Sequence, residues 1–295
     1  MSATSASWEH HTLPGGLPLR LHRRSGPQVL AARLWLRGGS SSDPAGERGG
    51  AQLLAGLLTR GCGNLDAEAL ADAVEGCGAA LRAEAGEDQL AISLKCASSD
   101  AEALVPLLLS MAREPRLDDD QIELERQLNL QTLQRQREDP FQLAHDQLRQ
   151  QLYGDGPYGH DPLGVEADLA AIGHAQLAPR VDQLGGAGAV MVLCGDVPAN
   201  LLDGLAERLQ ASPWSSHLPE AGGGPEGEPG VPLACTEQPT EQLVLMQGCA
   251  TICLSHPDGL PLRLLQAHLG LGMSSRLFVA MREERGLAYD VGVHM

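Results

Sequence analysis

Paired histidines or cysteines are the side chains with which a chain of this size could hold a zinc ion and activate water. The sequence contains ten histidines and seven cysteines. No two histidines have the HxxxH spacing that would place both on one face of a helix. Cys249 and Cys253 have that spacing, but no second Cys or His pair follows at zinc-finger distance. The odd number of cysteines favours reduced, buried thiols and ordinary packing over a disulfide framework.

The sequence also lacks a phosphate-loop motif. Gly270 and Gly272 precede Ser274, but the GxxxxGK[ST] pattern of a phosphate loop is missing, so a flexible turn before a helix is the better interpretation. Lys95 is the only lysine, and 38 acidic against 21 basic side chains leave a net charge of −17. No Lys/Arg-rich run could follow a phosphate backbone, and we expect no nucleic-acid partner.

The N-terminus and the hydropathy pattern bear on the compartment. The first residues, MSATSASWEHHTLPGG, lack the charged and apolar regions of a secretory signal. No apolar stretch approaches the roughly 20 residues that a membrane helix needs. We therefore expect a cytoplasmic protein with no membrane partner.

Strands and helices are predicted in mixed order over the first 212 residues, which is typical of an α+β domain. Two hairpins are predicted, one over 17–37 and one over 81–97 with a turn at 86–88. Helices are predicted over 49–61, 67–74, 103–111, 118–138, 140–153 and 201–209, and a further strand over 189–195. Ser99 and Glu102 form a capping-box pattern before the third helix. The helix over 118–138 has a narrow apolar stripe at Leu124, Leu128, Leu130 and Leu133.

The second half of the chain predicts a linker and part of another domain. Residues 213–232 are rich in Gly, Pro and Glu without periodicity, which indicates an interdomain linker. Residues 233–295 form the second domain, with strands over 242–250 and near Ala288 and helices over 260–270 and 274–285. This segment is short beside the first domain, so we expect a second domain that is truncated relative to a two-domain whole.

Four segments resemble one known family. They are GMSSRLFVAMREERGLAYDVG from Gly272 to Gly292, LYGDGPYGHDPLG from Leu152 to Gly164, AVMVLCGDV from Ala189 to Val197, and Glu125-Arg126-Gln127. In order and spacing they are similar to the insulinase or pitrilysin-like peptidases, the inverzincins that include mitochondrial processing peptidase. The resemblance implies a two-domain peptidase fold, in which each domain is a mixed, mainly antiparallel sheet packed with helices.

The zinc site of that family is degenerate in this sequence. Active members carry HxxEH on the helix after the first hairpin and a glutamate on the long downstream helix. The matching positions hold Gln52 and Gly56 in place of the histidines, Ala55 in place of the general base, and Thr132 in place of the downstream glutamate. Glu125 matches a supporting glutamate and is retained. These residues form a poor zinc set, so we expect no metal, no cofactor and no catalysis by this chain alone.

Two residues of the family's second domain are retained. In active members an arginine and a tyrosine face the zinc site, contact the substrate backbone and stabilise the developing oxyanion. Arg282 and Tyr289 match them. A guanidinium offers a fixed fork of donors and a phenol offers one hydrogen bond, so both suit that role. The alternative is that Arg282 forms salt bridges locally and Tyr289 is an ordinary strand aromatic.

The resemblance supports one function and leaves two alternatives. Family members commonly pair a zinc-bearing chain with a homologue that lacks the motif. The first hypothesis is therefore an inactive subunit of a heterodimeric zinc metallopeptidase, whose HxxEH-bearing partner carries the zinc. It would form part of a chamber, hold an extended peptide by edge-strand pairing, and contribute Arg282 and Tyr289. The alternatives are a peptide- or protein-binding scaffold and a peptidase with a rearranged zinc site. An acidic chamber would favour basic peptides.

Overall fold

The computed structural model describes residues 7–211, 214, 233–253 and 255–295. The chain divides into two compact units, Met1–Gly248 and Cys249–Met295. Most of the predicted linker, 213 and 215–232, lies outside the described residues. Trp214 is described and is buried, with its indole N–H donating to the carbonyl of Leu184 at 2.9 Å. The predicted boundaries at 212 and 232 stay a prediction.

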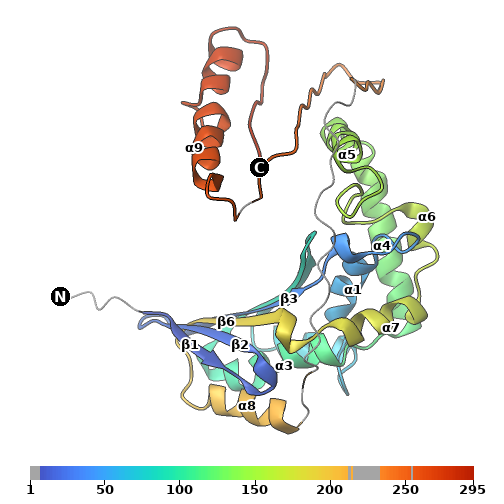
Figure 1. Cartoon of the computed structure of the whole chain (residues 1–295). Coiled ribbons are helices and arrows are strands. Elements are labelled where there is room, and N and C mark those ends of the chain that lie inside the picture. The colour runs from blue at the N-terminus through green and yellow to red at the C-terminus, as the bar shows by residue number, and fades with distance from the viewer. Residues whose placement is uncertain (1–6, 212–213, 215–232, 254) are drawn as a thin grey trace, which may run out of the picture. The chain divides into compact units, whose positions relative to one another are not determined.

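A single six-stranded sheet forms the framework of the first unit (Figure 1). The strand order is β1-β2-β6-β3-β5-β4. The strands are β1 Glu9–Thr12, β2 Pro18–Arg23, β3 Val29–Arg37, β4 Ala80–Ala85, β5 Gln89–Ala97 and β6 Ala189–Gly195. The predicted α+β class is confirmed. Strand β1, with the polar sequence EHHT, lacks the apolar alternation that predicts a strand.

One predicted hairpin is confirmed and the other is wrong. Strands β4 and β5 pair antiparallel around the predicted turn. Strands β2 and β3 exist, but β6 lies between them, parallel to β2 and antiparallel to β3. Strand β6 pairs on both of its edges, so it separates β2 from β3. Its Met191 and Leu193 side chains are fully buried. Such long-range pairing leaves no trace in the local pattern of β2 and β3.

In the described residues of the first unit, the six predicted helices are found, and two more, over 166–169 and 174–183, lie outside the predicted ranges. They are α1 Gly50–Leu58, α2 Ala67–Glu75, α3 Ala101–Arg113, α4 Asp119–Gln136, α5 Pro140–Tyr153, α6 Glu166–Leu169, α7 His174–Gln183 and α8 Leu201–Ala211. The predicted capping box of Ser99 and Glu102 does not form. Helix α3 begins at Ala101 after a short 3-10 turn, so Ser99 precedes the N-cap position and no side chain caps the helix.

The buried face of α4 differs from the predicted apolar stripe. Leu124 and Leu128 are each 40% exposed. The buried residues are instead Ile122, Glu125, Asn129 and Leu133. Helix α4 packs on α1, and the face that meets α1 carries the Glu125 carboxylate rather than a continuous leucine row.

The hydrophobic core lies on one face of the sheet. Every second residue of the inner strands points toward it, as in β3, where Leu30, Ala32, Leu34 and Leu36 are buried. Helices α1 and α3 contact the sheet, and α8 contacts α3 (Figure 1). This packing fixes α1 against the edge of the sheet formed by β4.

The second unit contains α9 Gly259–Gly270 and a π-helical segment, Phe278–Glu283. Both predicted helices are therefore found, the second with π rather than α turns at its centre. The strands predicted over 242–250 and near Ala288 are wrong, because neither segment has a strand partner among the described residues. A strand is stable only when its backbone groups are paired, whatever its side-chain pattern. The predicted second sheet is accordingly absent from this part of the chain.

Two further features of the fold are the state of the cysteines and the length of the apolar helices. All seven cysteines are free. Cys62 and Cys96 are buried as predicted, but four others are exposed because they lie at a helix end or in coil segments. Among the described residues, no helix is long and apolar enough to cross a membrane.

Candidate functional site

Helix α1 carries the positions that match the family's zinc motif. Gln52 and Gly56, four residues apart, lie on one half-buried face of the helix. Ala55 points into the hydrophobic core and is 1% exposed. The two positions that match the zinc motif therefore share one face of α1, and Gly56 meets Glu125 of α4. The position of the general base is filled by a core methyl group.

The Glu125 carboxylate occupies the space beside Gly56. Glu125 is 8% exposed, and its Oε1 accepts from Arg60 Nε at 2.7 Å and lies 2.6 Å from Arg60 Nη2. A Cβ built on Gly56 would overlap Oε2 and lie 2.8 Å from Cδ of Glu125. Any side chain at position 56 would therefore displace this carboxylate. Arg60, two residues past the end of α1, balances its charge.

The residues at this site do not fit a zinc ion. Thr132 is exposed, and its hydroxyl donates to the carbonyl of Leu128 at 2.8 Å. Asn129, one turn beyond Glu125, is 6% exposed, and its Nδ2 has no hydrogen-bond partner among the described residues. No group of three His, Cys, Asp or Glu side chains in the described part of the chain could hold a metal. A single carboxylate already paired with a guanidinium is no substitute for the thiolate and imidazole ligands that zinc requires.

The N-terminal end of α1 is held by a buried ion pair. The Asp43 side chain is fully buried and accepts from the backbone N–H groups of Gly49 at 2.7 Å and Ala51 at 3.0 Å. Arg180 of α7 donates to the same carboxylate and to Glu47 at 3.2 Å. Burial raises the pKa of Asp43, and the positive charge of Arg180 opposes that rise. The carboxylate therefore caps α1 in place of an N-cap side chain.

A second polar contact holds the residue before α1. Arg48 Nε donates to Asp168 Oδ2 at 2.7 Å, and the Arg48 backbone N–H donates to the same oxygen at 3.2 Å. The hydrogen bond from Arg48 lowers the pKa of the Asp168 carboxyl. Gly49 and Gly164 meet nearby with backbone atoms so close that a Cβ on either glycine would clash. The backbone that leads into the N-terminus of α1 is thus closely packed.

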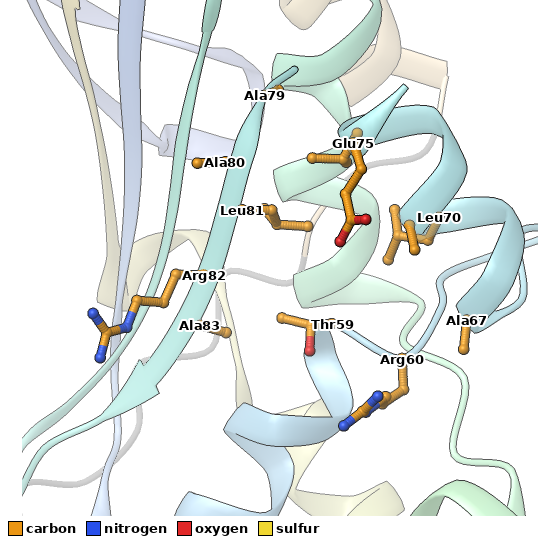
Figure 2. A pocket seen from close by; sticks show the side chains of 12 residues that line it. Thr59, Arg60, Ala67, Leu70, Glu75, Ala79, Ala80, Leu81, Arg82 and Ala83 are labelled. Carbon is orange, nitrogen blue, oxygen red and sulfur yellow. The ribbon is translucent and has the colours of Figure 1, made fainter. Parts of the chain in front are cut away.

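A pocket of about 460 Å³ lies between the C-terminal end of α1, helix α2 and strand β4 (Figure 2). Figure 2 shows Leu70 of α2 and Leu81 of β4 facing each other across it, with Arg60 at one end. Arg82 points to the other side of the strand. Strand β4 is an end strand of the sheet and pairs only with β5. The sequence predicts these elements but not the pocket, which depends on their packing.

Arg282 and Tyr289 meet in the second unit. The Arg282 guanidinium carbon lies 4.8 Å from the centre of the Phe278 ring and 5.3 Å from that of Tyr289. Tyr289 is 87% exposed. Arg282 lies in the π-helical segment and is also exposed. The two predicted substrate-binding residues are therefore neighbours, held by a cation–π contact, and their role toward a substrate stays a prediction.

Three features of the first site were missed by reasoning from the sequence. Arg60 and Asn129 are polar neighbours of Glu125, and Asp43 caps α1. Arg60 follows Gly56 by four residues and Asn129 follows Glu125 by four, so helical spacing could have placed each beside its neighbour. The pairing of Asp43 with Arg180 joins residues 137 positions apart, and no local signal predicts it.

Family comparisons cover most of the chain. Residues 21–164 match the family described as insulinase (peptidase family M16), and residues 184–294 match the one described as peptidase M16 inactive domain. An uncharacterized zinc protease of Mycobacterium leprae is 28% identical over 98% of this chain and 66% of its own length. An uncharacterized zinc protease of Bacillus subtilis is 23% identical over 96% of this chain and 69% of its own length. The beta subunit of a mitochondrial processing peptidase from Lentinula edodes is 26% identical over 59% of this chain and 37% of its own length.

Solved structures show the same fold. A peptidase M16 inactive domain from Pseudomonas fluorescens superposes with a TM-score of 0.80 at 24% identity, over 97% of this chain and 70% of that one. A protease from Helicobacter pylori gives a TM-score of 0.80 at 19% identity, over 98% of this chain and 71% of that one. The chain spans 66% and 65% of the lengths of the mycobacterial relatives from M. leprae and M. bovis. With matches to both family models and this fold, the chain belongs to the insulinase family of peptidases, family M16.

Proposed function

We propose that this chain is the non-catalytic subunit of a heterodimeric zinc metallopeptidase, with the zinc on a homologous HxxEH-bearing partner. One observation carries the proposal. The Glu125–Arg60 pair fills the space beside Gly56 that a second zinc ligand would need. The helix that bears the zinc motif in active members thus keeps its packing without its ligands. We infer that this chain contributes structure and substrate contacts rather than the metal.

The free edge of the sheet supports a role in holding peptide. Among the described residues, strand β4 pairs only with β5 and its other edge has no strand partner. An extended peptide can add to such an edge through main-chain hydrogen bonds. The pocket between β4 and α2 lies next to that edge and has apolar walls at Leu70 and Leu81. One side chain of an added peptide strand could enter it. We propose that β4 and this pocket form the peptide-binding part of the subunit.

Arg282 and Tyr289 are the residues proposed to reach the substrate. Their exposed positions leave the guanidinium and the phenol free to contact a bound peptide. Arg282 could donate to a peptide carbonyl, and Tyr289 could donate to charge that develops on the oxyanion. The cation–π contact would hold both in one orientation. Their contribution depends on a zinc site supplied by the partner.

The names of relatives support a partner but identify none. Two relatives of this chain are described as zinc proteases, and one as a subunit of a processing peptidase. We propose a zinc-bearing homologue from the same organism as the partner and the cytoplasm as the compartment. Extended peptide is the proposed substrate.

The test is stimulation of a partner's activity. The full chain is titrated into the HxxEH-bearing homologue, and cleavage of a quenched fluorescent peptide is followed with and without chelator. We expect no cleavage by this chain alone and saturable stimulation near one to one. Arg282→Ala should lower turnover while the complex still assembles on a sizing column. Arg285→Ala, which removes an exposed arginine three residues away, is the matched control and should leave turnover unchanged.

The alternative functions predict different outcomes. Assembly without any change in turnover would favour a peptide- or protein-binding scaffold. Chelator-sensitive cleavage by this chain alone, with one zinc bound per chain, would show a rearranged metal site. Equal turnover for Arg282→Ala and Arg285→Ala in the assembled complex would contradict the proposed role of Arg282.

A further inference from the structure

The second face of the sheet carries cationic side chains. The core side chains occupy one face, and the alternate residues of the strands project from the other. On β3 these alternate residues include Arg33, Trp35 and Arg37, all half-buried. Five cationic and one anionic side chain occupy this face: Arg20, Arg33, Arg37, Arg82, Lys95 and Glu84. Its charge balance is opposite to that of the chain, which is −17.

Three of the arginines form one row across the sheet. Arg20 on β2 is the register partner of Val192, and Val192 is the partner of Arg33 on β3. Arg33 is the partner of Ser93, and Ser93 is the partner of Arg82 on β4. Arginines therefore alternate with the small or apolar side chains of Val192 and Ser93. We call Arg20, Arg33 and Arg82 the arginine row.

The spacing of the arginine row follows from the geometry of a sheet. Neighbouring strands lie about 4.7–4.9 Å apart, so residues two strands apart lie about 9.5 Å apart. A peptide in the polyproline II conformation has three residues per turn and rises about 3.1 Å per residue, so its residues i, i+3 and i+6 share one face and lie about 9.3 Å apart. Side chains at these three positions therefore match the three arginines. In a β-strand, by contrast, residue i+3 would project from the opposite face. The repeat of the row thus selects a polyproline II segment laid across the strands.

The row is only partly neutralised within the chain. Glu84 is the carboxylate that pairs with it, through a close contact to Arg33 and a longer one, at 3.9 Å, to Arg82. The Arg33 guanidinium also lies 4.1 Å above the Trp35 ring, which holds it in place. In the described part of the chain, no carboxylate forms an ion pair with Arg20, and Arg82 is 80% exposed. The row can therefore accept negative charge from outside.

The surrounding charge limits how long the anion can be. Screening confines the attraction to within about 8 Å at physiological ionic strength, so the row acts locally. A long polyanion such as nucleic acid would extend beyond the face and meet the acidic surface of a chain with 17 excess negative charges. A short peptide with three spaced carboxylates fits within the face. Charge complementarity thus favours an acidic peptide over nucleic acid.

We propose that the arginine row binds an acidic peptide segment in the polyproline II conformation, with carboxylates at positions i, i+3 and i+6. The opposite expectation, that an acidic chamber selects basic peptides, does not apply to this face. The row ends at Arg82 on β4, next to the edge at which a substrate peptide is proposed to pair. Calling the acidic segment a part of the substrate rests on the proposed function, whereas its binding to the row does not.

The test compares three labelled peptides of equal length by fluorescence anisotropy, with this chain alone. One labelled peptide has three glutamates at i, i+3 and i+6, a second has the three glutamates adjacent, and a third has glutamines in their place. We expect the spaced peptide to bind more tightly than the adjacent one, and the glutamine peptide to bind least. Affinity for the spaced peptide should fall as salt is raised.

Variants of the row provide the second arm. The triple variant Arg20→Gln, Arg33→Gln, Arg82→Gln should bind the spaced peptide at least about tenfold less tightly. This figure combines three exposed ion pairs, each of which contributes about two- to fivefold in affinity. Arg135→Gln, an exposed arginine on α4, is the matched control and should bind normally. Arg82→Gln alone is the milder variant if the triple variant does not fold, because Arg82 is the most exposed of the three.

Four outcomes would overturn the proposal. The first two are that the adjacent peptide, or the glutamine peptide, binds as tightly as the spaced peptide. The third is that Arg135→Gln weakens binding of the spaced peptide as much as Arg82→Gln does. The fourth is that a short oligonucleotide displaces the labelled spaced peptide at a lower concentration than the unlabelled spaced peptide does. None of these bears on stimulation of a zinc-bearing partner, so the two proposals fail separately.

Discussion

The two ends of helix α1 differ in the side chains that surround them. At the N-terminal end, Asp43 and Arg180 form a buried pair that caps the helix. In the middle and toward the C-terminal end, the positions that match the family's zinc motif hold Gln52 and Gly56, and the Glu125 carboxylate fills the space beside Gly56. The N-terminal end is therefore held by a buried ion pair, while the matching positions carry neither histidine nor carboxylate.

In helix α1, the contacts that maintain the fold are thus separate from the positions that match the zinc motif. A helix needs its N-terminal N–H groups satisfied and its apolar face buried in order to pack, whatever its exposed face does. The face toward α4 can pack without histidines if another group fills the space and its charge is balanced. Arg60 provides that balance for Glu125. The comparison teaches that the space beside Gly56 is filled by a side chain of α4, and that an ion pair balances its charge.

The largest expected effect is at the N-terminal end. Asp43→Ala should lower the free energy of unfolding by about 3–5 kcal/mol, because it leaves the buried Arg180 guanidinium without its main partner and removes the cap from two backbone N–H groups. Urea unfolding followed by tryptophan fluorescence measures it. All three tryptophans, Trp8, Trp35 and Trp214, lie in the Met1–Gly248 unit and report on its unfolding.

The control for that variant is an exposed acid on the same helix as Arg180. Asp182→Ala on α7 should change the free energy of unfolding by less than about 0.5 kcal/mol. An Asp43→Ala effect as small as the Asp182→Ala effect would show that the buried pair does not hold α1.

A middle-sized effect is expected where Glu125 meets Gly56. In the unchanged chain, Gly56→Ala should lower the free energy of unfolding by about 1 kcal/mol, because the new methyl group displaces the Glu125 carboxylate from Arg60. In a Glu125→Ala background the same change should raise it by about 0.5–1 kcal/mol, the ordinary gain in helix propensity. Urea unfolding of the four chains measures the coupling.

Gly204→Ala is the matched control for this cycle. Gly204 lies in α8, and a Cβ there meets nothing within 4 Å. It should stabilise the chain equally in both backgrounds. If Gly56→Ala changed the free energy of unfolding in the same direction in both backgrounds, the result would contradict the displacement of Glu125 from Arg60.

The smallest effect concerns the pH dependence of the contact before α1. The hydrogen bond from Arg48 lowers the pKa of Asp168 below its ordinary value of 3.8. The stability that this carboxylate contributes is thus fully present above pH 3.8 and is lost as the pH falls through the lowered pKa. Asp168→Asn should therefore be less stable than the unchanged chain near neutral pH, and the difference should shrink below pH 3.8. Urea midpoints across pH measure it, and a constant difference down to the lowest pH would contradict the assignment.

Local patterns predicted most elements of the first unit. The periodicity of leucine placed α1, α4 and α8, and the turn residues Gly86 to Asp88 placed the β4–β5 hairpin. Patterns failed where pairing is long-range. The β2–β3 hairpin is interrupted by β6, and the segment over 242–250 has the composition of a strand without a partner. Side-chain alternation describes what one strand presents, and says nothing about which strand lies beside it.

The positions of the candidate site were matched by motif, and its contacts were missed. Motif spacing identified Gln52, Ala55, Gly56 and Glu125, because helical geometry places residues four apart on one face whatever their type. The contact between the Arg282 guanidinium and the Tyr289 ring was not among the predictions. The Asp43–Arg180 pair, the pocket beside β4 and the arginine row were not predicted, since each joins elements that are far apart in the sequence.

The sequence by itself determined the family and the residue types at the positions that match its zinc motif. Both are properties of residue type and local spacing, which folding does not alter. Tertiary structure alone decided what fills the space beside Gly56 and where the cationic side chains gather. Glu125 reaches Gly56 only because α4 packs on α1. Arg20, Arg33 and Arg82 align only because β6 and β5 intervene between their strands in one register. Contacts between distant segments depend on packing and register, which are properties of the assembled sheet and helices.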